Sequence, residues 1–281
     1  VRTSQSTTMK SSRRRVVITG ATQGIGHSIA SQIAAIPNTE VILVCRDQAR
    51  GEAVAKEISN STGNMDVRCE VANVANFKSI LALRERLCSN AVHVLVNNAA
   101  ECPPVRKEIN GREVQFATNV LGYFWMIRAF ADLLRAGHKE TGEPSRVVNV
   151  ASNWAGDLDL DDLEFKRRPY DIDTAYRQSK QADRMLTVSW AELLQPEVLV
   201  NSCHPGDPCT KLSTALGYNL HASKDCSSAA RTPVYLATHP DVREVTGKWF
   251  QSMRASPCQY AGSGMQASRK RLFEICEDLS N

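Results

Sequence analysis

The sequence predicts an α/β protein built as a doubly wound, parallel sheet of about seven strands in a single domain. Apolar runs alternate with amphipathic, helix-type segments along the chain, a pattern typical of strand–helix–strand units. Most of the apolar runs are short and nearly uninterrupted, as in strands that helices bury on both faces. A glycine-rich turn joins the first run to the first amphipathic segment. The 281 residues suit one hydrophobic core, and no linker or internal repeat divides them.

The first half of the chain contains four expected strands with helices between them. The strands lie at 16–19, 40–45, 65–71 and 92–96. The first helix carries Ile25, Ile29 and Ile33 at helical spacing and ends before Pro37. The next two helices are expected at 48–60 and 76–89.

The second half continues the alternation. Helices are expected at 111–136, 174–194 and 225–238, and a last helix carries Leu272, Ile275, Cys276 and Leu279. Strands are expected at 146–150, 198–203 and 247–252. Two polar, irregular stretches, 153–173 and 206–224, follow strands at their carboxyl ends, where open α/β sheets bind ligands.

The positive charge is concentrated at the start of the chain. The formal net charge is +4, yet five of the 34 basic residues lie in the first 15 positions, and the other 29 face 30 acidic residues. We therefore expect residues 1–12 to form a disordered basic tail and residues 13–281 to form the domain. The predicted domain without this tail has a net charge close to zero, so it provides no electrostatic field that attracts nucleic acid. The tail is Ser/Thr-rich and free of acid, so the end of a transit segment is an alternative. Because the first residue is Val, we expect the natural start to lie upstream.

Cysteine usage points to a reducing compartment. The nine cysteines are irregularly spaced and include no C-x-x-C pair, which favours reduced thiols over a disulfide framework. We expect a cytoplasmic protein, with import into an organelle as the alternative. No apolar run approaches the roughly 18 residues of a transmembrane helix, and no Cys or His pair has zinc-site spacing. Neither a membrane span nor a bound metal is expected, and Cys102 and Cys209 are interpreted as ordinary thiols.

The glycine-rich turn reads Thr-Gly-Ala-Thr-Gln-Gly-Ile-Gly over residues 19–26. Glycines let such a turn close, and they let backbone N–H groups approach a pyrophosphate at a helix N-terminus. The spacing is G-x-x-x-G-x-G, and no Gly-Lys-Ser/Thr follows, so this is no Walker loop. The turn predicts a dinucleotide site, with a purely structural turn as the alternative.

Further chemistry-bearing elements follow in a fixed order. They are Asn97-Asn98-Ala99-Ala100, Asn119, Ser152, Tyr176-x-x-x-Lys180, and Pro205-Gly206 with Thr210. In this order, over about residues 15–255, the chain resembles the short-chain dehydrogenases/reductases, a family of Rossmann-fold oxidoreductases. Cys45-Arg46-Asp47 and the segment 232–237 are most similar to its retinol-dehydrogenase-like and carbonyl-reductase-like branches.

The resemblance implies a set of residues that contact a nicotinamide dinucleotide. They are Gly20, Thr22, Gln23, Gly24, Ile25, Gly26, Arg46, Glu70, Val71, Asn97, Ala99, Lys180, Pro205, Gly206 and Thr210. NAD enzymes place an acid at the end of the second strand, whereas NADP enzymes use an arginine. Here Cys45 takes the position of the acid and Arg46 follows it, so we expect NADP(H) rather than NAD(H). Asp47 argues mildly against this choice, and the neutral Gln23 adds no second cation to the turn.

The catalytic group is predicted from side-chain chemistry and from the resemblance together. Tyr176 and Lys180 lie four residues apart on an expected helix and therefore share a face. A nearby ammonium, together with the positive charge of an oxidised nicotinamide, favours the phenolate of a tyrosine and lowers its pKa, so Tyr176 is the expected acid–base group. Ser152 is expected to hydrogen-bond the reacting oxygen. The resemblance implies that Lys180 also holds the nicotinamide ribose and that Asn119 supports a proton relay.

Several positions depart from the family pattern. Ala100 stands where the family usually has Gly, and Asp207 is an unusual carboxylate beside the nicotinamide edge. The acidic and basic insert at 153–173 is expected to shape the substrate mouth, to cover a dimer surface, or to be a solvated loop. Asn153 and Trp154 are the predicted substrate-binding residues. The side chains of Leu212, Leu216 and Tyr218 add an apolar lining.

The predicted function is an NADP(H)-dependent oxidoreductase that transfers a hydride between the nicotinamide and a carbonyl or alcohol, such as an aldehyde, a ketone or a retinoid-like molecule. A non-catalytic NADP(H)-binding sensor or scaffold is the alternative from another class. A light-dependent protochlorophyllide-type reductase, which shares the double alanine after Asn-Asn, is the lower alternative. The expected partners are a small-molecule substrate and a second copy of the chain, because helices 111–136 and 174–194 form the family's common dimer surface.

Overall fold

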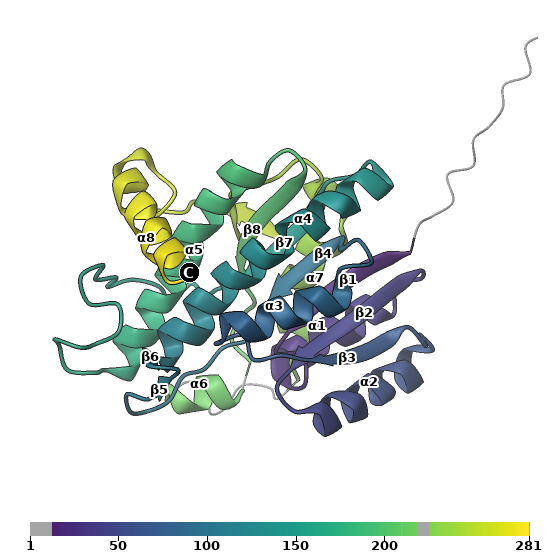
Figure 1. Cartoon of the computed structure of the whole chain (residues 1–281), viewed down its shortest axis with the longest axis horizontal. Coiled ribbons are helices and arrows are strands. Elements are labelled where there is room, and N and C mark those ends of the chain that lie inside the picture. Colours follow the sequence, from purple (N-terminus) through teal and green to yellow (C-terminus); the bar gives the residue numbers. More distant parts are fainter. Residues whose placement is uncertain (1–12, 209, 218–224, 281) are drawn as a thin grey trace, which may run out of the picture.

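The computed structural model describes residues 13–208, 210–217 and 225–280 and confirms the doubly wound α/β fold (Figure 1). The sheet has the order β10-β9-β8-β7-β4-β1-β2-β3. All neighbours pair in parallel except β10 and β9, which are antiparallel. The strands are β1 (Arg14–Thr19), β2 (Thr39–Cys45), β3 (Val67–Val71), β4 (Val94–Asn97), β7 (Ser145–Val150), β8 (Val198–His204), β9 (Trp249–Gln251) and β10 (Arg254–Ser256).

Helices bury the sheet from both sides, as the apolar strands require. One core joins the sheet to α1 (Gly24–Ala34), α2 (Gln48–Thr62) and α7 (Ser227–Thr238). The opposite core joins it to α3 (Phe77–Leu87), α4 (Gly122–Thr141), α5 (Ile172–Leu194) and α8 (Gln266–Asp278). Since the central strands β1 and β4 are neighbours whose helices diverge, the carboxyl edge of the sheet opens into a crevice there.

The helix predicted at 111–136 is wrong at both ends. Residues 108–113 form a hairpin of β5 (Glu108–Ile109) and β6 (Arg112–Glu113), turned by Asn110 and Gly111 at positive φ. The carboxylate of Glu113 then accepts the backbone N–H groups of Gln115 (3.0 Å) and Phe116 (2.8 Å), which caps the helix start there. A π-helical segment, η1 (Phe116–Leu121), precedes α4.

The insert at 153–173 is an ordered, packed segment rather than a solvated loop. Asp162 is 6% exposed, and its carboxylate accepts the backbone N–H groups of Lys166 (2.7 Å), Arg167 (3.1 Å) and Arg168 (3.0 Å). Apolar residues of the insert pack on the core beneath α4 and α5; they are Ala155, Leu158, Leu160 and Leu163.

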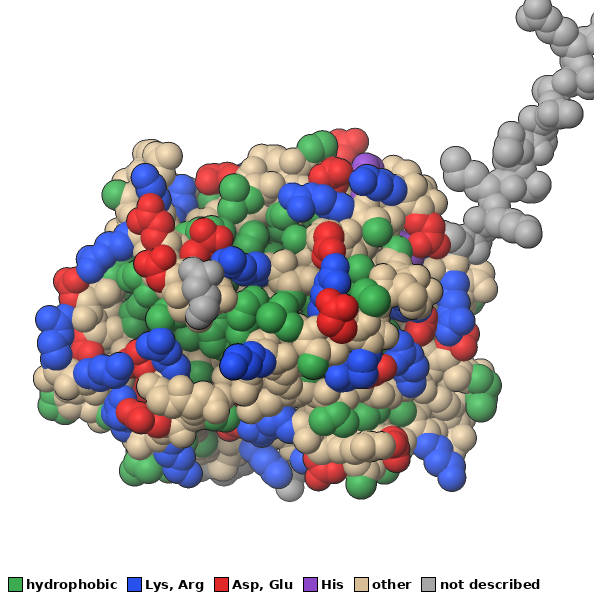
Figure 2. All heavy atoms as spheres, in the orientation of Figure 1, with side chains coloured by type: hydrophobic (Ala, Val, Ile, Leu, Met, Phe, Trp, Pro, Cys, Tyr) green, Lys and Arg blue, Asp and Glu red, His purple; other side chains and the backbone are tan. Residues whose placement is uncertain are grey.

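Helix α8 lies on the outer face of α4 and α5 (Figure 1). The ring of Phe273 packs 4.9 Å from the rings of both Phe124 and Trp190. Figure 2 shows apolar side chains gathered near the end of α8, with charged side chains around them. A dimer formed through α4 and α5 would have to accommodate or displace α8. The homodimer therefore stays a prediction.

Two short elements fall where only irregular chain was expected. They are β10 and the helix α6 (Lys211–Ala215), whose first turn is capped by Thr210 and Ser213. Residues 1–12, Cys209 and Tyr218 lie outside the described residues. The disordered basic tail, the ordinary thiol of Cys209 and the place of Tyr218 in the apolar lining therefore stay predictions. Across the part of the chain that the structure describes, no helix combines the length and apolar character of a membrane span. The same residues contain no cluster of three potential metal ligands.

Candidate active site

The glycine-rich turn connects β1 to α1 and is held from the neighbouring strand. Gly20 has φ +66°, and a Cβ on it would lie 2.7 Å from the Cα of Ala99, so only glycine fits. A Cβ on Gly26 would lie 2.3 Å from the carbonyl oxygen of Gly20. The hydroxyl of Thr19 accepts the backbone N–H groups of Asn98 (2.9 Å) and Ala99 (3.1 Å). The predicted Asn-Asn-Ala segment thus braces the turn that starts α1.

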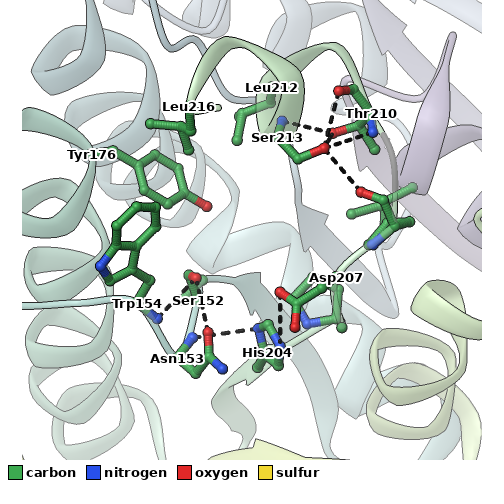
Figure 3. Close-up of a pocket in the computed structure, with 15 residues that line it drawn as sticks. Ser152, Asn153, Trp154, Tyr176, His204, Asp207, Thr210, Leu212, Ser213 and Leu216 are labelled. Atoms are coloured by element: carbon green, nitrogen blue, oxygen red, sulfur yellow. Dashed lines mark hydrogen bonds and ion pairs between the residues drawn. The ribbon is translucent and has the colours of Figure 1, made fainter. Parts of the chain in front are cut away.

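A cavity of about 450 Å³ runs from this turn along the carboxyl edge of the sheet (Figure 3). It brings Ile25 at the start of α1 together with Ser152, Tyr176, the Pro205-Gly206 turn and Thr210. These residues are far apart in sequence and meet because each follows a parallel strand or starts a helix at the same edge. A helix N-terminus at one end of the cavity suits a pyrophosphate, so the site fits a nicotinamide dinucleotide.

Ser152 and Tyr176 face the same space from two elements (Figure 3). Ser152 follows β7, and its Oγ accepts the backbone N–H of Trp154 at 3.1 Å. Tyr176 lies on α5, which begins where the Asp171 carboxylate accepts the N–H of Thr174 at 2.8 Å. Burial raises the pKa of the Tyr176 phenol, while Lys180 and a hydrogen bond with Ser152 act to lower it. Lys180 thus acts on the Tyr176 pKa in the predicted direction, and burial acts against it.

Lys180 lies one turn after Tyr176 on the buried face of α5. Its Nζ donates to a carboxylate oxygen of Asp183 at 3.0 Å and to the carbonyl of Val150 at 3.2 Å. The ammonium lies 5.8 Å from the centre of the Tyr176 ring. Burial acts to lower the pKa of Lys180, but Asp183 and the two nearby tyrosines raise it above its ordinary value. Lys180 is thus held as a cation next to Tyr176.

Asn119 lies in η1 and is fully buried. Its Oδ1 accepts the backbone N–H of Glu101 at 2.9 Å, and its Nδ2 donates to the Glu101 carbonyl and to the Ser179 hydroxyl. Asn119 therefore joins the loop after β4 to α5 directly behind Tyr176. Isolated π-helical turns occur frequently at functional sites. Its part in a proton relay stays a prediction.

Two arginines gather at the other end of the site, beside the turn. Arg46 follows β2, and its guanidinium pairs with Glu101 at 2.8 Å. Arg50, one turn further along the chain on α2, donates to the carbonyl of Thr22 (3.3 Å) and to the side chain of Gln23 (2.8 Å). Neither Arg50 nor Glu101 is among the residues predicted from the sequence. The i, i+4 spacing of Arg46 and Arg50 was the available signal for Arg50.

Other predicted cofactor residues have mixed surroundings. The carboxylate of Glu70 already pairs with Arg68 and with Arg86 (2.8 Å), whereas Val71 is 40% exposed at the end of β3. Asn97 is fully buried, and its side chain donates to Asn149 at 2.9 Å across the sheet. Contacts of these residues with a cofactor stay predictions.

The remaining wall of the cavity divides into a polar and an apolar side. Asn153 and Trp154, the predicted substrate-binding residues, both line the cavity. The ring of Trp154 packs edge-on against the ring of Tyr176, with 6.3 Å between the ring centres. On the polar side, His204 Nε2 lies 3.6 Å from a carboxylate oxygen of Asp207. Burial lowers the pKa of His204, although Asp207 acts to raise it. Apolar side chains complete the wall opposite; they are Leu212 and Leu216.

Fold and cavity together define the class of dinucleotide-dependent oxidoreductases. Comparison with known protein families supports this class, because the family model described as short chain dehydrogenase matches residues 14–220. The chain belongs to the short chain dehydrogenase family, which confirms the resemblance seen in the sequence. Members of this family are oxidoreductases that act on alcohols and carbonyls with a nicotinamide cofactor.

Individual relatives cover most of the chain. Retinol dehydrogenase 13 of Mus musculus is 35% identical over 261 residues, which span 86% of this chain and 76% of that protein. Short-chain dehydrogenase TIC 32 A, chloroplastic, of Brassica napus is 30% identical over 254 residues, or 83% and 78% of the two chains. The crystal structure of an uncharacterized protein from Mycobacterium Paratuberculosis has a TM-score of 0.73 at 26% identity and covers 96% of this chain and 94% of that one.

Proposed function

We propose that the protein is an NADP(H)-dependent reductase or dehydrogenase of an apolar carbonyl or alcohol, with Tyr176 as the acid–base group. The observation that supports this proposal best is the shared cavity: the Ser152 hydroxyl and the Tyr176 phenol face one space that also reaches the turn before α1 (Figure 3). A carbonyl oxygen in that space would accept hydrogen bonds from both groups.

The two arginines support NADP(H) as the cofactor. Arginine is suited to phosphate because its planar guanidinium donates two parallel hydrogen bonds. The side chain of Arg46 is 63% exposed beside the dinucleotide turn, and Arg50 is anchored to the turn itself. Cys45, where NAD enzymes have an acid, provides no carboxylate to repel a 2′-phosphate.

A nicotinamide bound in this cavity would supply the hydride to the carbonyl carbon in reduction, or accept it in oxidation. Tyr176 donates its phenolic proton to the carbonyl oxygen during reduction and accepts it back during oxidation. Ser152 donates a hydrogen bond that stabilises the negative charge that develops on this oxygen. Lys180 stabilises the phenolate that Tyr176 becomes, and the packed rings of Trp154 and Tyr176 exclude water from the reacting atoms.

The cavity wall supports an apolar substrate with a polar end. Trp154, Leu212 and Leu216 form the apolar side near Tyr176, and His204 with Asp207 forms the polar side. Among the relatives, retinol dehydrogenase 13 is named for an apolar alcohol. We therefore place retinoids together with long-chain aldehydes and aryl ketones first in a substrate search.

The proposal is tested by turnover of such a panel with NADPH and with NADH. We expect oxidation of NADPH, a preference for NADPH over NADH, and a loss of at least about 100-fold in kcat for Tyr176→Phe, the magnitude typical of general acid–base catalysis. Phe keeps the ring packed against Trp154, so NADPH binding should remain.

Two outcomes would contradict the proposal. Wild-type protein that binds NADPH but turns over no substrate would favour the sensor or scaffold function. Activity that appears only under illumination would favour the protochlorophyllide-type alternative.

A further inference from the structure

Asp183 is a buried carboxylate that the proposed reaction leaves unused. It lies on α5, three residues after Lys180, and its side chain is 0% exposed while that of Lys180 is 2% exposed. One carboxylate oxygen accepts from the Lys180 ammonium at 3.0 Å, and the other, Oδ1, has no hydrogen-bond partner among the described residues. Asp183 does not line the cavity, so it can act on the reaction only through Lys180.

A carboxylate in this position changes the charge that Tyr176 experiences. A buried ion pair at 3.0 Å is a dipole, and its field at a third group is much weaker than that of a lone ammonium. The ammonium is fixed on its far side by Asp183 and by the carbonyl of Val150, and it lies 5.1 Å from the ring of Tyr123 and 5.8 Å from that of Tyr176. Both the place and the strength of the positive charge thus depend on Asp183.

Other titratable groups around the pair do not replace this charge. Tyr123 on α4, Cys203 on β8, Cys276 on α8 and Cys102 after β4 all have pKa values that burial raises, so they are neutral at physiological pH. Three carboxylates also act on Cys102, and they belong to Asp173, Glu113 and Glu101. Burial also raises the pKa of Asp183, whereas the Lys180 ammonium at 3.0 Å acts to lower it and favours the charged carboxylate.

We propose that Asp183 is a positioning residue that fixes the Lys180 ammonium and offsets its charge, so that the Tyr176 phenol keeps its proton to a higher pH than it would beside a lone ammonium. The inference rests on the proposed function, because it concerns the proton that Tyr176 transfers. Its consequence is the pH range of catalysis: oxidation requires the phenolate and accelerates as the pH rises towards the Tyr176 pKa, whereas reduction requires the protonated phenol.

The test is the substitution Asp183→Asn, which keeps the shape and one oxygen acceptor but removes the charge. We expect the pKa of Tyr176 to fall by about one unit, as removal of a compensating charge beside an ammonium predicts. The pH at which kcat/KM for oxidation levels off and the pH above which kcat/KM for reduction falls should therefore both move down by about one unit. Asp183→Ser, which leaves room for water, should move the profile in the same direction and serves as the second variant where Asn impairs folding.

Two readouts separate this inference from the proposed function. The first is the pH profile of kcat/KM in both directions. The second is the near-ultraviolet tyrosinate titration of the substrate-free protein, with Tyr176→Phe as the subtracted blank, which needs no turnover. Glu192→Gln is the matched control, since it removes one negative charge from an exposed position of the same helix.

Each result has one meaning. Profiles and titrations of the Asp183 variants that coincide with those of the wild type and of Glu192→Gln would overturn the inference while the proposed function stands. A wild-type protein that is inactive on every substrate would defeat the proposed function, and the tyrosinate titration would still decide the role of Asp183. A fall in stability with an unchanged Tyr176 pKa would show a purely structural role.

Discussion

The proposed preference for NADP(H) depends on single side chains at the dinucleotide end of the site. Arg46 is paired with Glu101 at 2.8 Å, and Glu101 in turn is held through its backbone by Asn119. A phosphate that binds Arg46 has to share the guanidinium with this carboxylate or displace it. Glu101 therefore competes with the phosphate for the Arg46 guanidinium. The sequence does not reveal this pairing, because 55 positions separate the two residues.

Substitution of Arg46 and Glu101 should shift NADPH affinity in opposite directions. Arg46→Ala should weaken NADPH binding by about 10- to 100-fold, the equivalent of one charge-assisted hydrogen bond, and leave NADH binding nearly unchanged. Glu101→Gln should tighten NADPH binding by several-fold, because the guanidinium loses its competing carboxylate. Fluorescence titration with both cofactors measures this, with Arg231→Ala on the exposed face of α7 as the control. Equal losses for NADPH and NADH would contradict the assigned role of Arg46.

At the scale of elements, the polar insert at 153–173 shows how local hydrogen bonds order a segment that looks like a loop. Its charged composition predicts solvent exposure, yet Asp162 and Glu164 turn inward and bind backbone N–H groups, and Leu163 and Phe165 are buried between them. The sequence pattern predicts neither the backbone hydrogen bonds nor the apolar packing of this segment, because hydrophobic periodicity reveals only regular helices and strands. The hairpin at 108–113 escaped prediction for the same reason, since each of its strands has two residues.

Asp162→Ala should loosen the insert. Three backbone N–H groups lose their acceptor, and we expect a loss of about 2 kcal/mol in the free energy of unfolding. Trypsin should cleave faster after Lys166, Arg167 or Arg168 in the folded protein. Asp159→Ala is the control, because that side chain accepts from the nearby Asp161 N–H. Cleavage at the wild-type rate would show that apolar packing alone orders the insert.

At the scale of the whole molecule, buried ion pairs tie the edge of the sheet together. Glu40 on β2 is 8% exposed and pairs with Arg15 on β1 (3.0 Å) and with Arg68 on β3 (3.2 Å). Burial acts to raise the pKa of Glu40, but the arginines, with Arg13, outweigh it and hold the pKa below its ordinary value. A lowered folded-state pKa stabilises the fold above the ordinary carboxyl pKa, and this contribution is lost as the pH falls through the lowered value.

Glu40→Gln should therefore destabilise the protein by about 2 kcal/mol at neutral pH, since charge-assisted hydrogen bonds to two arginines are weakened. The difference from wild type should stay constant from about pH 8 to pH 5 and shrink only below the ordinary carboxyl pKa of about 4.3. Urea unfolding across this range measures it, with the exposed Glu85→Gln as control. If the difference in unfolding free energy between the two proteins does not shrink below the ordinary carboxyl pKa, the charge of Glu40 is not its cause.

The sequence by itself determined the alternation of strands and helices, the parallel sheet, the turn at residues 19–26 and the Ser152, Tyr176 and Lys180 set. These features are local in the chain: apolar runs, glycines and the i, i+4 spacing of a tyrosine and a lysine are all visible in short windows. Only the tertiary structure decided what surrounds them. Burial opposes the effect of Lys180 on the pKa of Tyr176, Asp183 pairs with Lys180, Glu101 pairs with Arg46, and α8 packs on the face expected to form a dimer. Desolvation and charge pairing depend on which segments meet in space. These contacts form only when the strands pair and the helices pack on the sheet.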